Sequence, residues 1–505
     1  MRKLILTLVG MVCMTVVMAD DTYPSLTIEC ADGSTTSLSV NNLTMSVDDI
    51  SLTAVNDNGT ETFTLTDLTK MYFSGTSENT TLKGDVNRDG KVDISDVVAI
   101  INTMACVLIY EDADVNNDDS VDISDIVAVI NIIAGTESAD ESTTDEETDI
   151  EASDTIQTLN ICQGNVIYRF HSYEVDTMTY SNGTTLTVMD MTFKLNEITS
   201  MYVDNSIVYD NQVDVVYSDN EAKLFIPGNI GQYISSKLTS AHVVLTQSGV
   251  PEEVTYCLSG SSDDGSFYMA GSYKASLDLR GLTLTNPKGA AINIQNSKRI
   301  AVSVKKDTEN TLKDGVSNTD KGCFVCKGHT EFKGRGVLNI YSYGSSAHGI
   351  KSGEYMSIRN CTINVLRSTR DGVHCGEYFL MESGELNVSG AGDDCLQVEL
   401  DGAVSTGVTT DHEDEDSGNI YILDGVLNLT PTADAVKGMR SAGDIEINGG
   451  IITITRPGQS YPPRQTSAIR QASSLTETST SPAARLTSRT QETAVKESVL
   501  RVPSP

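Results

Sequence analysis

Two stretches of the chain carry carboxylate and amide side chains at the spacing used by calcium-binding loops. The first is GDVNRDGKVDISDVVAIIN, from Gly84 to Asn102, and a near-copy, ADVNNDDSVDISDIVAVIN, begins at Ala113. Ca²⁺ takes about six to eight oxygen ligands, and an EF-hand loop supplies them from places 1, 3, 5, 7, 9 and 12. The sequence therefore predicts two calcium loops, because a merely solvated acidic run would not repeat this ligand spacing.

The predicted ligands follow the same order in both copies. In the first loop they are Asp85, Asn87, Asp89, the backbone carbonyl of Lys91, Asp93 and Asp96; in the second they are Asp114, Asn116, Asp118, the backbone carbonyl of Ser120, Asp122 and Asp125. Place 12 is aspartate rather than the usual glutamate in both loops. Place 6 is Gly90 in the first loop but Asp119 in the second. A residue with a β-carbon tolerates the left-handed backbone less well, which puts the affinity of the second site in question.

Each loop is followed by a pattern that predicts one amphipathic helix. The apolar residues predicted to share a face are Val97, Ile100, Ile101 and Met104 in the first helix, and Ile126, Val129, Ile130 and Ile133 in the second. No such helix precedes the first loop, so residues 81–135 form a duplicated loop–helix, which resembles a type I dockerin. The resemblance implies a small α-helical domain that folds on binding Ca²⁺ and docks onto a cohesin-like protein. It places partner recognition at Ile94, Ser95, Ile123 and Ser124.

A different repeat occupies residues 215–456. The stretches GIKSGEYMSIRNCTINV from Gly349, GVHCGEYFLMESGELNV from Gly372 and GMRSAGDIEINGGIITI from Gly438 align without gaps. Asn364 and Asn387 mark one period of this repeat, and the longer step from Asn387 to Asn428 contains a polar insertion, residues 401–418. A period in the low twenties, built from short β runs broken by glycine, indicates a solenoid. Because no coil contains a helical pattern, we predict a parallel β-helix rather than a leucine-rich repeat.

Acidic residues of this repeat could bind a further metal ion. Asp371 and Asp394 occupy equivalent places on successive coils, which are about 4.8 Å apart in a β-sheet. Asp393 and Asp401 lie nearby in the sequence. Calcium held by these four residues could bridge an acidic polysaccharide to an acidic protein. A purely structural acidic turn explains the same residues equally well.

Several stretches of the repeat resemble secreted β-helix carbohydrate-binding proteins that are related in fold to calcium-dependent pectate lyases. They are GSFYMAGSYKASLDLRGLTLTNPKGAAINIQNSKRI, KGCFVCKGHTEF, AHGIKSGEY, GAGDDCLQVELDG and TTDHEDEDSGNIYI. The resemblance implies a right-handed parallel β-helix that binds plant cell-wall polysaccharide, either cellulose or acidic pectin. It also implies that Ca²⁺ takes part in the site.

Enzymatic activity is the less favoured interpretation. A lyase would abstract a proton beside a uronate carboxylate with lysine or arginine, while calcium acidifies that proton. Lys351, Lys437 and Arg440 occupy similar coil positions, with His348 and His374 close by, but no catalytic arrangement stands out from the sequence. We therefore expect non-catalytic binding. A polysaccharide lyase and a structural surface protein without a glycan ligand remain the alternatives.

Composition sets the class of the protein and its location. The 505 residues carry a formal net charge of −35, so nucleic acid is not an expected partner, since binding phosphates requires clustered basic residues. Residues 1–19 have the charged start, short apolar run and small-residue end of a signal peptide. We expect a secreted or surface-exposed protein without a membrane span. The cysteines after the signal peptide are expected to be buried thiols, because Cys323 and Cys326 lack the second pair of a zinc site and should face opposite sides of a strand.

The remaining segments complete the predicted organisation. FTLTDLTKMYF from Phe63 and FKLNEITSMYV from Phe193 match in their apolar positions, so residues 20–78 and 158–204 are predicted to be two copies of a small β module. Residues 136–157 are predicted to form an extended acidic linker. Residues 457–505 hold six of the 11 prolines and one of the 39 glycines, which indicates a disordered tail or a slipped reading frame. The chain as a whole is predicted to be mostly β.

Overall fold

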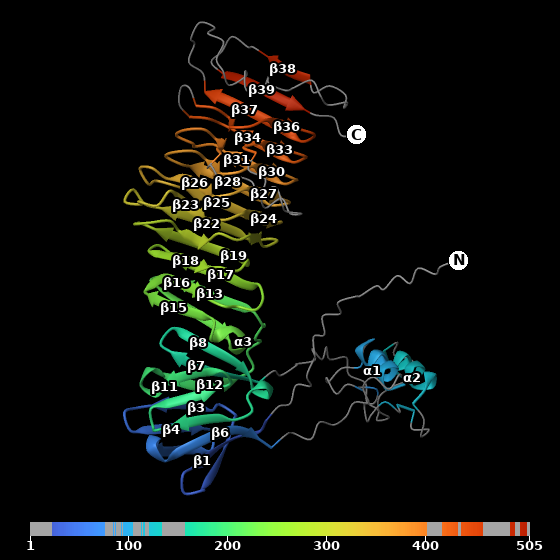
Figure 1. Cartoon of the computed structure of the whole chain (residues 1–505), viewed down its shortest axis with the longest axis vertical. Helices are drawn as coiled ribbons and strands as arrows, with labels where there is room; N and C mark the ends of the chain where they lie inside the picture. Colours follow the sequence, from blue (N-terminus) through green and yellow to red (C-terminus); the bar gives the residue numbers. More distant parts are fainter. Residues whose placement is uncertain are drawn as a thin grey trace, which may run out of the picture. The chain divides into compact units, whose positions relative to one another are not determined.

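The protein is described from a computed structural model. The structure describes residues 23–75, 84, 86, 92, 94–104, 113, 115–116, 121–133, 157–400, 417–432, 436–457, 485–489 and 495–501. Its contacts divide the chain into two compact units, one made of Met1–Asn160 and Phe170–Ile207, the other of Ile161–Arg169 and Val208–Pro505. The fold is mostly β with few helices, as predicted (Figure 1). The predicted signal peptide and residues 136–156 of the predicted linker lie outside the described residues.

The first unit contains an antiparallel sheet to which both predicted β modules contribute. Its strands, in spatial order, are β11 (Met191–Lys194), β10 (Thr185–Val188), β9 (Met178–Ser181), β6 (Leu68–Ser74), β1 (Ser25–Cys30) and β2 (Thr35–Ser39). Strand β6 of the first module pairs with β9 of the second. The matched residues Met71 and Met201 are both fully buried, which explains why the two copies share their apolar pattern.

The other elements of this region are short. They are β3 (Thr44–Val47), β4 (Ser51–Asn56), β5 (Gly59–Thr64), β7 (Thr158–Gln163), β12 (Ser200–Asp204) and the 3-10 turns η1 (Leu65–Asp67), η2 (Ser172–Glu174) and η3 (Leu195–Glu197). Strand β3 pairs with β4 and with β12, so the repeated modules also meet at a second edge. Their apolar residues are thus buried against one another, which neither short module could achieve alone.

The duplicated loop–helix forms two helices that pack together, α1 (Ile94–Met104) and α2 (Ile123–Ile133). Val97 and Ile100 from α1 and Val129 from α2 are buried with the loop residues Val86 and Val115. The predicted broad apolar face is wrong in part, because Ile101, Met104, Ile130 and Ile133 are 40–48% exposed. Two short helices bury only a narrow line of contact between them, so the apolar residues beside that line remain at the surface.

The second unit is a stack of coils whose strands form three parallel ladders. In Figure 1 these strands follow one another from β13 (green) to β37 (orange). The first ladder contains β16 (Ala241–Gln247), β18 (Gly265–Gly271), β20 (Ile292–Asn296), β23 (Gly322–Cys326), β26 (His348–Ser352), β29 (Val373–Cys375), β32 (Leu396–Val398) and β35 (Met439–Ser441), with β15 (Ile234–Thr239) antiparallel at its edge.

The second and third ladders belong to a larger sheet. The second contains β13 (Gln212–Ser218), β17 (Val254–Ser262), β19 (Ala275–Asn286), β21 (Ile300–Val304), β24 (Thr330–Gly334), β27 (Met356–Arg359), β30 (Phe379–Met381), β33 (Ile420–Ile422) and β36 (Ile445–Ile447). The third contains β22 (Glu309–Asp314), β25 (Val337–Tyr341), β28 (Thr362–Arg367), β31 (Glu385–Val388), β34 (Val426–Leu429) and β37 (Ile451–Pro457). The long strand β19 pairs with both β21 and β22 and so begins both ladders.

The ends of the second unit carry other pairings. Strand β8 (Val166–His171) pairs in parallel with β14 (Glu221–Pro227), which leads into the short helix α3 (Gly228–Gly231). Strands β38 (Arg485–Arg489) and β39 (Val495–Arg501) pair with each other, and β39 pairs with β37, in antiparallel fashion. The predicted disordered or out-of-frame end, 457–505, stays a prediction, since β38 and β39 are nearly all of it that the structure describes.

The predicted register of the coils is confirmed by the third ladder. Asn339, Asn364, Asn387 and Asn428 lie side by side, and each side-chain amide donates to the preceding one over 2.7–2.8 Å. The longer step from Asn387 to Asn428 therefore does contain one coil plus an insertion. Residues 401–416 of that insertion lie outside the part of the chain that the structure describes.

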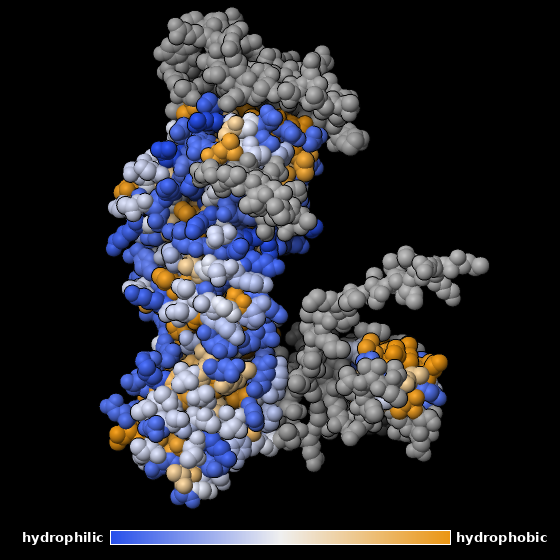
Figure 2. All heavy atoms as spheres, viewed as in Figure 1, coloured by the Kyte–Doolittle hydropathy of each residue, from blue (hydrophilic) through white to orange (hydrophobic). Residues whose placement is uncertain are grey.

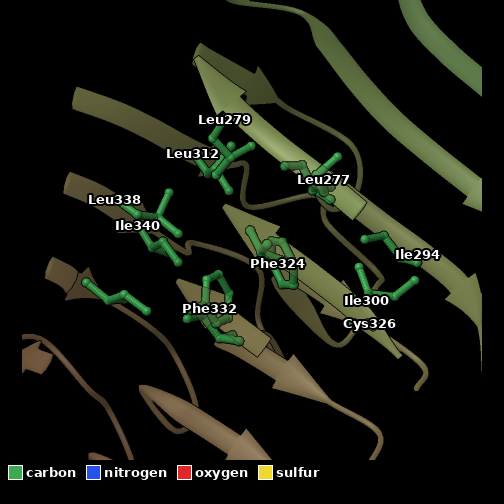
Figure 3. Packing of buried hydrophobic residues seen from close by; sticks show 14 of the residues in the cluster. Leu277, Leu279, Ile294, Ile300, Leu312, Phe324, Cys326, Phe332, Leu338 and Ile340 are labelled. Atoms are coloured by element: carbon green, nitrogen blue, oxygen red, sulfur yellow. The ribbon is translucent and has the colours of Figure 1, made fainter. Parts of the chain in front are cut away.

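Apolar residues that alternate along these strands form one continuous core. Figure 3 shows Leu277, Leu279, Ile294, Phe324 and Phe332 pointing into it from successive coils. The described cysteines are all free thiols, as predicted, and all but one are buried.

The expectation that Cys323 and Cys326 face opposite sides was wrong, since both belong to the core. Cys323 lies at the corner where the chain turns into β23, and its equivalents on the next coils are Gly349 and Gly372. At this corner the consecutive residues Cys323 and Phe324 both point into the core, so side chains do not yet alternate between the two faces of the strand. The first of the two positions has room only for a small side chain. A β-carbon on Gly372 would lie 2.5 Å from Val388 Cγ1.

We expect Phe332→Ala to destabilise the second unit by about 3–5 kcal/mol, because it removes a 1%-exposed ring and leaves a cavity between coils. The measurement is urea unfolding followed by far-ultraviolet circular dichroism, since the chain has no tryptophan for fluorescence. Val316→Ala, at a 77%-exposed position of the same unit, is the control and should change stability little. Equal midpoints for the two variants would contradict this packing.

Candidate functional site

The corner that leads into the first ladder brings charged side chains of successive coils together. The register Ile350–Val373–Leu396–Met439, extended back by two residues, aligns His348, Asp371, Asp394 and Lys437. We call these four residues the corner row. The amide of Asp394 also donates to Oδ1 of Asp371 over 3.2 Å. The predicted juxtaposition of Asp371 and Asp394 is therefore confirmed.

Asp371 is the centre of the corner row. Its Oδ2 lies 2.9 Å from Nδ1 of His374 and 3.2 Å from Nδ1 of His348, and the two imidazole rings are 4.5 Å apart. All three side chains are buried. Burial by itself would raise the pKa of Asp371, but its contacts with His348 and His374 outweigh burial and lower the pKa to about 2. Asp371 is therefore a permanent buried anion at neutral pH.

His348 has two competing contacts on one nitrogen. Its Nδ1 faces Oδ2 of Asp371, and it also lies 3.3 Å from the amide nitrogen of Asp371, which donates to it. Burial lowers the pKa of His348 and favours the neutral ring. Nδ1 of a neutral ring either carries a hydrogen that it donates or offers a lone pair that accepts. Because Nδ1 of His348 accepts the Asp371 amide hydrogen, His374 is the better donor to the Asp371 carboxylate. The lone pair of His348 Nδ1 then faces the Asp371 carboxylate, and a proton or a cation between them would remove this repulsion.

Asp394 joins an acidic cluster with Asp371 and Asp393, in which one ligand oxygen of each residue lies within 4.8 Å of the others. Asp394 is buried, which raises its pKa, whereas the amide of Lys437 donates to its Oδ1 over 2.8 Å. Asp393 is exposed. Three of the four predicted metal ligands of the coils thus come together, while Asp401 lies outside the described residues. An oxygen set of this kind suits a hard divalent ion such as Ca²⁺.

Beside the acidic cluster, the outward side of the first ladder carries a second line of side chains. Backbone pairing aligns Tyr268, Asn293, Val325, Lys351, His374, Gln397 and Arg440, one from each coil. We call this line the outer row. Arg440 donates to Gln397 over 3.3 Å, and Gln397 in turn donates to Glu399. Apart from Val325, each member of the outer row carries a hydrogen-bond donor or acceptor, and His374 and Gln397 are buried. Hydroxyl-rich or carboxylate-bearing ligands can use the members that reach the surface.

Sequence reasoning missed a second group of side chains at another corner. His329, Glu354 and Glu377 place one ligand atom each within 4.8 Å of the others, where the coils enter the second ladder. Their spacing along the chain is the same as that of Asn339, Asn364 and Asn387 in the asparagine ladder. That shared period could have identified them.

In the loop–helix region, Asp96, Asn116, Asp122 and Asp125 are the predicted calcium ligands that the structure describes. Asp96 and Asp125, at place 12, are fully buried. Oδ1 of Asp96 accepts the amide of Val86 over 2.8 Å, and Oδ1 of Asp125 accepts the equivalent amide of Val115 over 2.9 Å. The two loops therefore close through the same contact. The other predicted ligands, Asp85, Asn87, Asp89, Lys91, Asp93, Asp114, Asp118 and Ser120, lie outside the described residues.

The predicted partner-binding residues are largely at the surface. Ile123 is 67% exposed and Ser124 is exposed, whereas Ser95 is partly buried. The side chain of Ile94 lies outside the described residues. Asn116 Nδ2 donates to Ser124 Oγ over 2.8 Å, which links the second loop to the start of α2.

Comparison with known proteins gives the family. A protein-family model described as "Carbohydrate-binding domain-containing protein" matches residues 239–496, just over half of the chain. The chain belongs to this family. The matched residues include the corner row, the acidic cluster and the outer row. No curated protein matches the chain.

A solved structure is also similar, titled as the polysaccharide lyase-like protein from C. thermocellum in a gadolinium derivative. It has 18% sequence identity and a TM-score of 0.35, and the match covers 48% of this chain and 94% of that chain. Within the described part of the chain, no helix has the length and apolar character needed to cross a membrane.

Protonation of Asp371 is expected to destabilise the second unit as the pH falls from about 4 to about 2. Its pKa is lowered from an ordinary value of 3.8 to about 2 on folding, so the unfolded chain binds the proton more tightly. The ionised Asp371 stabilises the folded state by about 2 kcal/mol. This contribution is fully present above pH 4 and is lost as the pH falls below it. Burial also lowers the pKa of His348 from its ordinary value of 6.5. Its protonation therefore destabilises the folded state in a separate pH range, below 6.5.

Urea unfolding at a series of pH values measures this effect. Asp371→Asn should lack the step between pH 4 and pH 2, whereas Asp424→Asn, in an exposed turn, should retain it. An unchanged acid profile in Asp371→Asn would show that the contacts with the two histidines do not hold this carboxylate ionised.

Proposed function

We propose that this protein is an exported, calcium-dependent binder of plant cell-wall polysaccharide, with cellulose or acidic pectin as the ligand. The observation that carries the proposal is the outer row beside the acidic cluster, within the residues matched by the carbohydrate-binding family. A polymer repeats along its length, and the outer row repeats one position per coil. We infer that the three ladders form a right-handed parallel β-helix, whose side presents such a regular line of contacts.

Calcium has a specific task in this proposal. The net charge of −35 repels an anionic polymer, so pectin needs a cation between its carboxylates and the protein. Asp393 is exposed next to the buried Asp371 and Asp394, so an ion held by the cluster would keep one side open to a ligand. Neutral cellulose would depend on Ca²⁺ less, because its hydroxyl groups can pair directly with exposed donors such as Arg440.

A polysaccharide lyase is the second candidate, and one observation bears on it. Nζ of Lys437 and Nη1 of Arg440 each lie 3.9 Å from Oδ2 of Asp394. Basic side chains next to a metal-binding carboxylate are what a lyase requires. The same positions serve charge pairing with Asp394, and we therefore favour binding without turnover.

The duplicated loop–helix supports attachment to another protein. Exposed apolar residues occur at the same places of both helices, since Val98, Ile101 and Met104 in the first copy correspond to Val127, Ile130 and Ile133 in the second. Figure 2 shows this apolar surface in orange on α1 and α2. We propose that residues 81–135 are a dockerin that binds Ca²⁺ and presents either helix to a cohesin-like partner. Export through the signal peptide at 1–19 would place the protein outside the cell.

Polysaccharide binding is tested on a panel of pectin, polygalacturonate and cellulose, with Ca²⁺ or with EDTA. Asp393→Asn should weaken binding of the acidic glycans by at least about tenfold, because it removes the negative charge of the exposed ligand of the ion. Asp424→Asn is the matched control. No binding to any glycan with Ca²⁺ would support a structural surface protein, and release of unsaturated uronides absorbing in the ultraviolet would establish a lyase.

Chelation is expected to lower the helical circular dichroism signal of the protein, because metal binding drives the folding of such loops. The double variant Asp96→Ala, Asp125→Ala should stay low in helix when Ca²⁺ is added, since both loops lose their closing contact with Val86 and Val115. Asp190→Ala, at an exposed turn, should respond like the unchanged protein. If neither calorimetric uptake of Ca²⁺ nor a spectral change on chelation is seen, the dockerin assignment fails.

A further inference from the structure

We propose that His329, Glu354 and Glu377 form a second metal site, which takes a divalent transition ion of the Zn²⁺ class rather than Ca²⁺. One ligand atom from each residue lies within 4.8 Å of the others. The site is built at the entrance to the second ladder and shares no residue with the acidic cluster at the entrance to the first. The inference therefore stands independently of the proposed polysaccharide function.

Three successive coils supply the ligands, and the backbone fixes their spacing. The amide of Thr330 donates to the carbonyl of Tyr355 over 3.0 Å, and the amide of Met356 donates to that of Tyr378 over 3.0 Å. His329 therefore lies just before one rung of the ladder, and Glu354 and Glu377 lie just before the tyrosines of the next two rungs. An ion bound by all three residues would cross-link three coils.

Aromatic rings hold the imidazole in place. The ring of His329 is 4.5 Å from that of Tyr355, and the rings of Tyr355 and Tyr378 stack at 4.8 Å with an interplanar angle of 13°. The hydroxyl of Tyr355 donates to Glu331 over 2.6 Å, so this ring cannot rotate away without losing that bond. The ligand nitrogen is thus oriented before any ion binds, which lowers the entropic cost of binding.

Charge favours a divalent cation among these residues. His329 and Glu377 are only 6% and 7% exposed, and the Glu354 side chain is 28% exposed. Nε2 of His329 contacts Oε2 of Glu354, an oxygen that is itself buried and has no regular hydrogen-bond donor. A protonated His329 would leave the three residues with a net charge of −1, whereas a neutral imidazole with a divalent ion leaves none. An uncompensated charge in a buried site is costly.

The ligand types select the metal. Calcium is bound by oxygen ligands, and an imidazole nitrogen is not among its usual partners. Zinc binds one imidazole and two carboxylates readily, and three protein ligands leave a position for water or another oxygen. The site is therefore expected to retain its preference for Zn²⁺ when Ca²⁺ is in large excess.

The test is binding of Zn²⁺ and Co²⁺ to the full chain in the presence of excess Ca²⁺. Calorimetry and metal analysis after dialysis give the stoichiometry, and Co²⁺ gives a visible absorption band that reports nitrogen and oxygen coordination. His329→Gln and Glu377→Gln should each lower the zinc stoichiometry by one ion per chain, or weaken that binding event at least about tenfold. His242→Gln is the matched control, because His242 pairs with Asp264 at 3.3 Å outside the site.

The zinc stoichiometry of the variants decides whether the site exists. Loss of one zinc ion in His329→Gln and Glu377→Gln, but not in His242→Gln, supports the site even if calcium-dependent glycan binding is absent. Equal zinc binding by the unchanged protein and His329→Gln overturns it and assigns the cluster to an ion pair. Should Glu377→Gln not fold, the Co²⁺ spectrum of the unchanged protein compared with that of His329→Gln decides the question.

Discussion

Parallel backbone pairing between successive coils is the constraint on which the rest of the second unit depends. Each strand pairs with the equivalent strand one coil away, so the paired strand positions are stacked on their counterparts. A side chain that suits one coil must therefore also suit its neighbours. Buried positions form columns of leucine, isoleucine, valine and phenylalanine. Burial of such columns stabilises coils that could not fold singly.

The same stacking also concentrates charge. Asp371 and Asp394 lie in adjacent coils because they occupy the same place in the repeat, and Glu354 and Glu377 meet at another corner for the same reason. Like charges at one-strand spacing repel each other in a partly dry environment. Each corner contains compensating groups, two histidines around Asp371 and one at the glutamates. Stacked strands with acidic corners can in this way bring metal-binding groups together, which is the basis of the Ca²⁺ and Zn²⁺ sites proposed above.

Much of this arrangement could be predicted from the sequence, because the period is visible in single residues such as Asn364 and Asn387. The alignment of Asp371 with Asp394 follows directly from that period. The role of His374 does not, since it reaches Asp371 from a position three residues further along the chain. That contact depends on the corner geometry, which also turned Cys323 inward against the strand alternation.

In the loop–helix region the sequence predicts the ligands and the helices but not which apolar side chains are buried. Ligand spacing in both loops is explicit in the sequence, as is the apolar spacing of both helices. Helical spacing alone does not give the width of the buried face. Ile101 and Ile130 were predicted to lie on it, but both are exposed. A pattern gives the direction in which a side chain points along a helix, whereas the partner that covers it belongs to the tertiary structure.

The hydrogen bonds between the stacked asparagines of the third ladder all run in one direction. Each amide donates toward the N-terminal side, and the first, Asn339, donates to the carboxylate of Glu309 over 2.8 Å. Aligned amide dipoles polarise one another, and an anion at the accepting end reinforces the whole series. A coil that slipped by one residue would put an aliphatic side chain into the series and interrupt it at that rung. The asparagine hydrogen bonds therefore favour the observed register of each coil on the one before it.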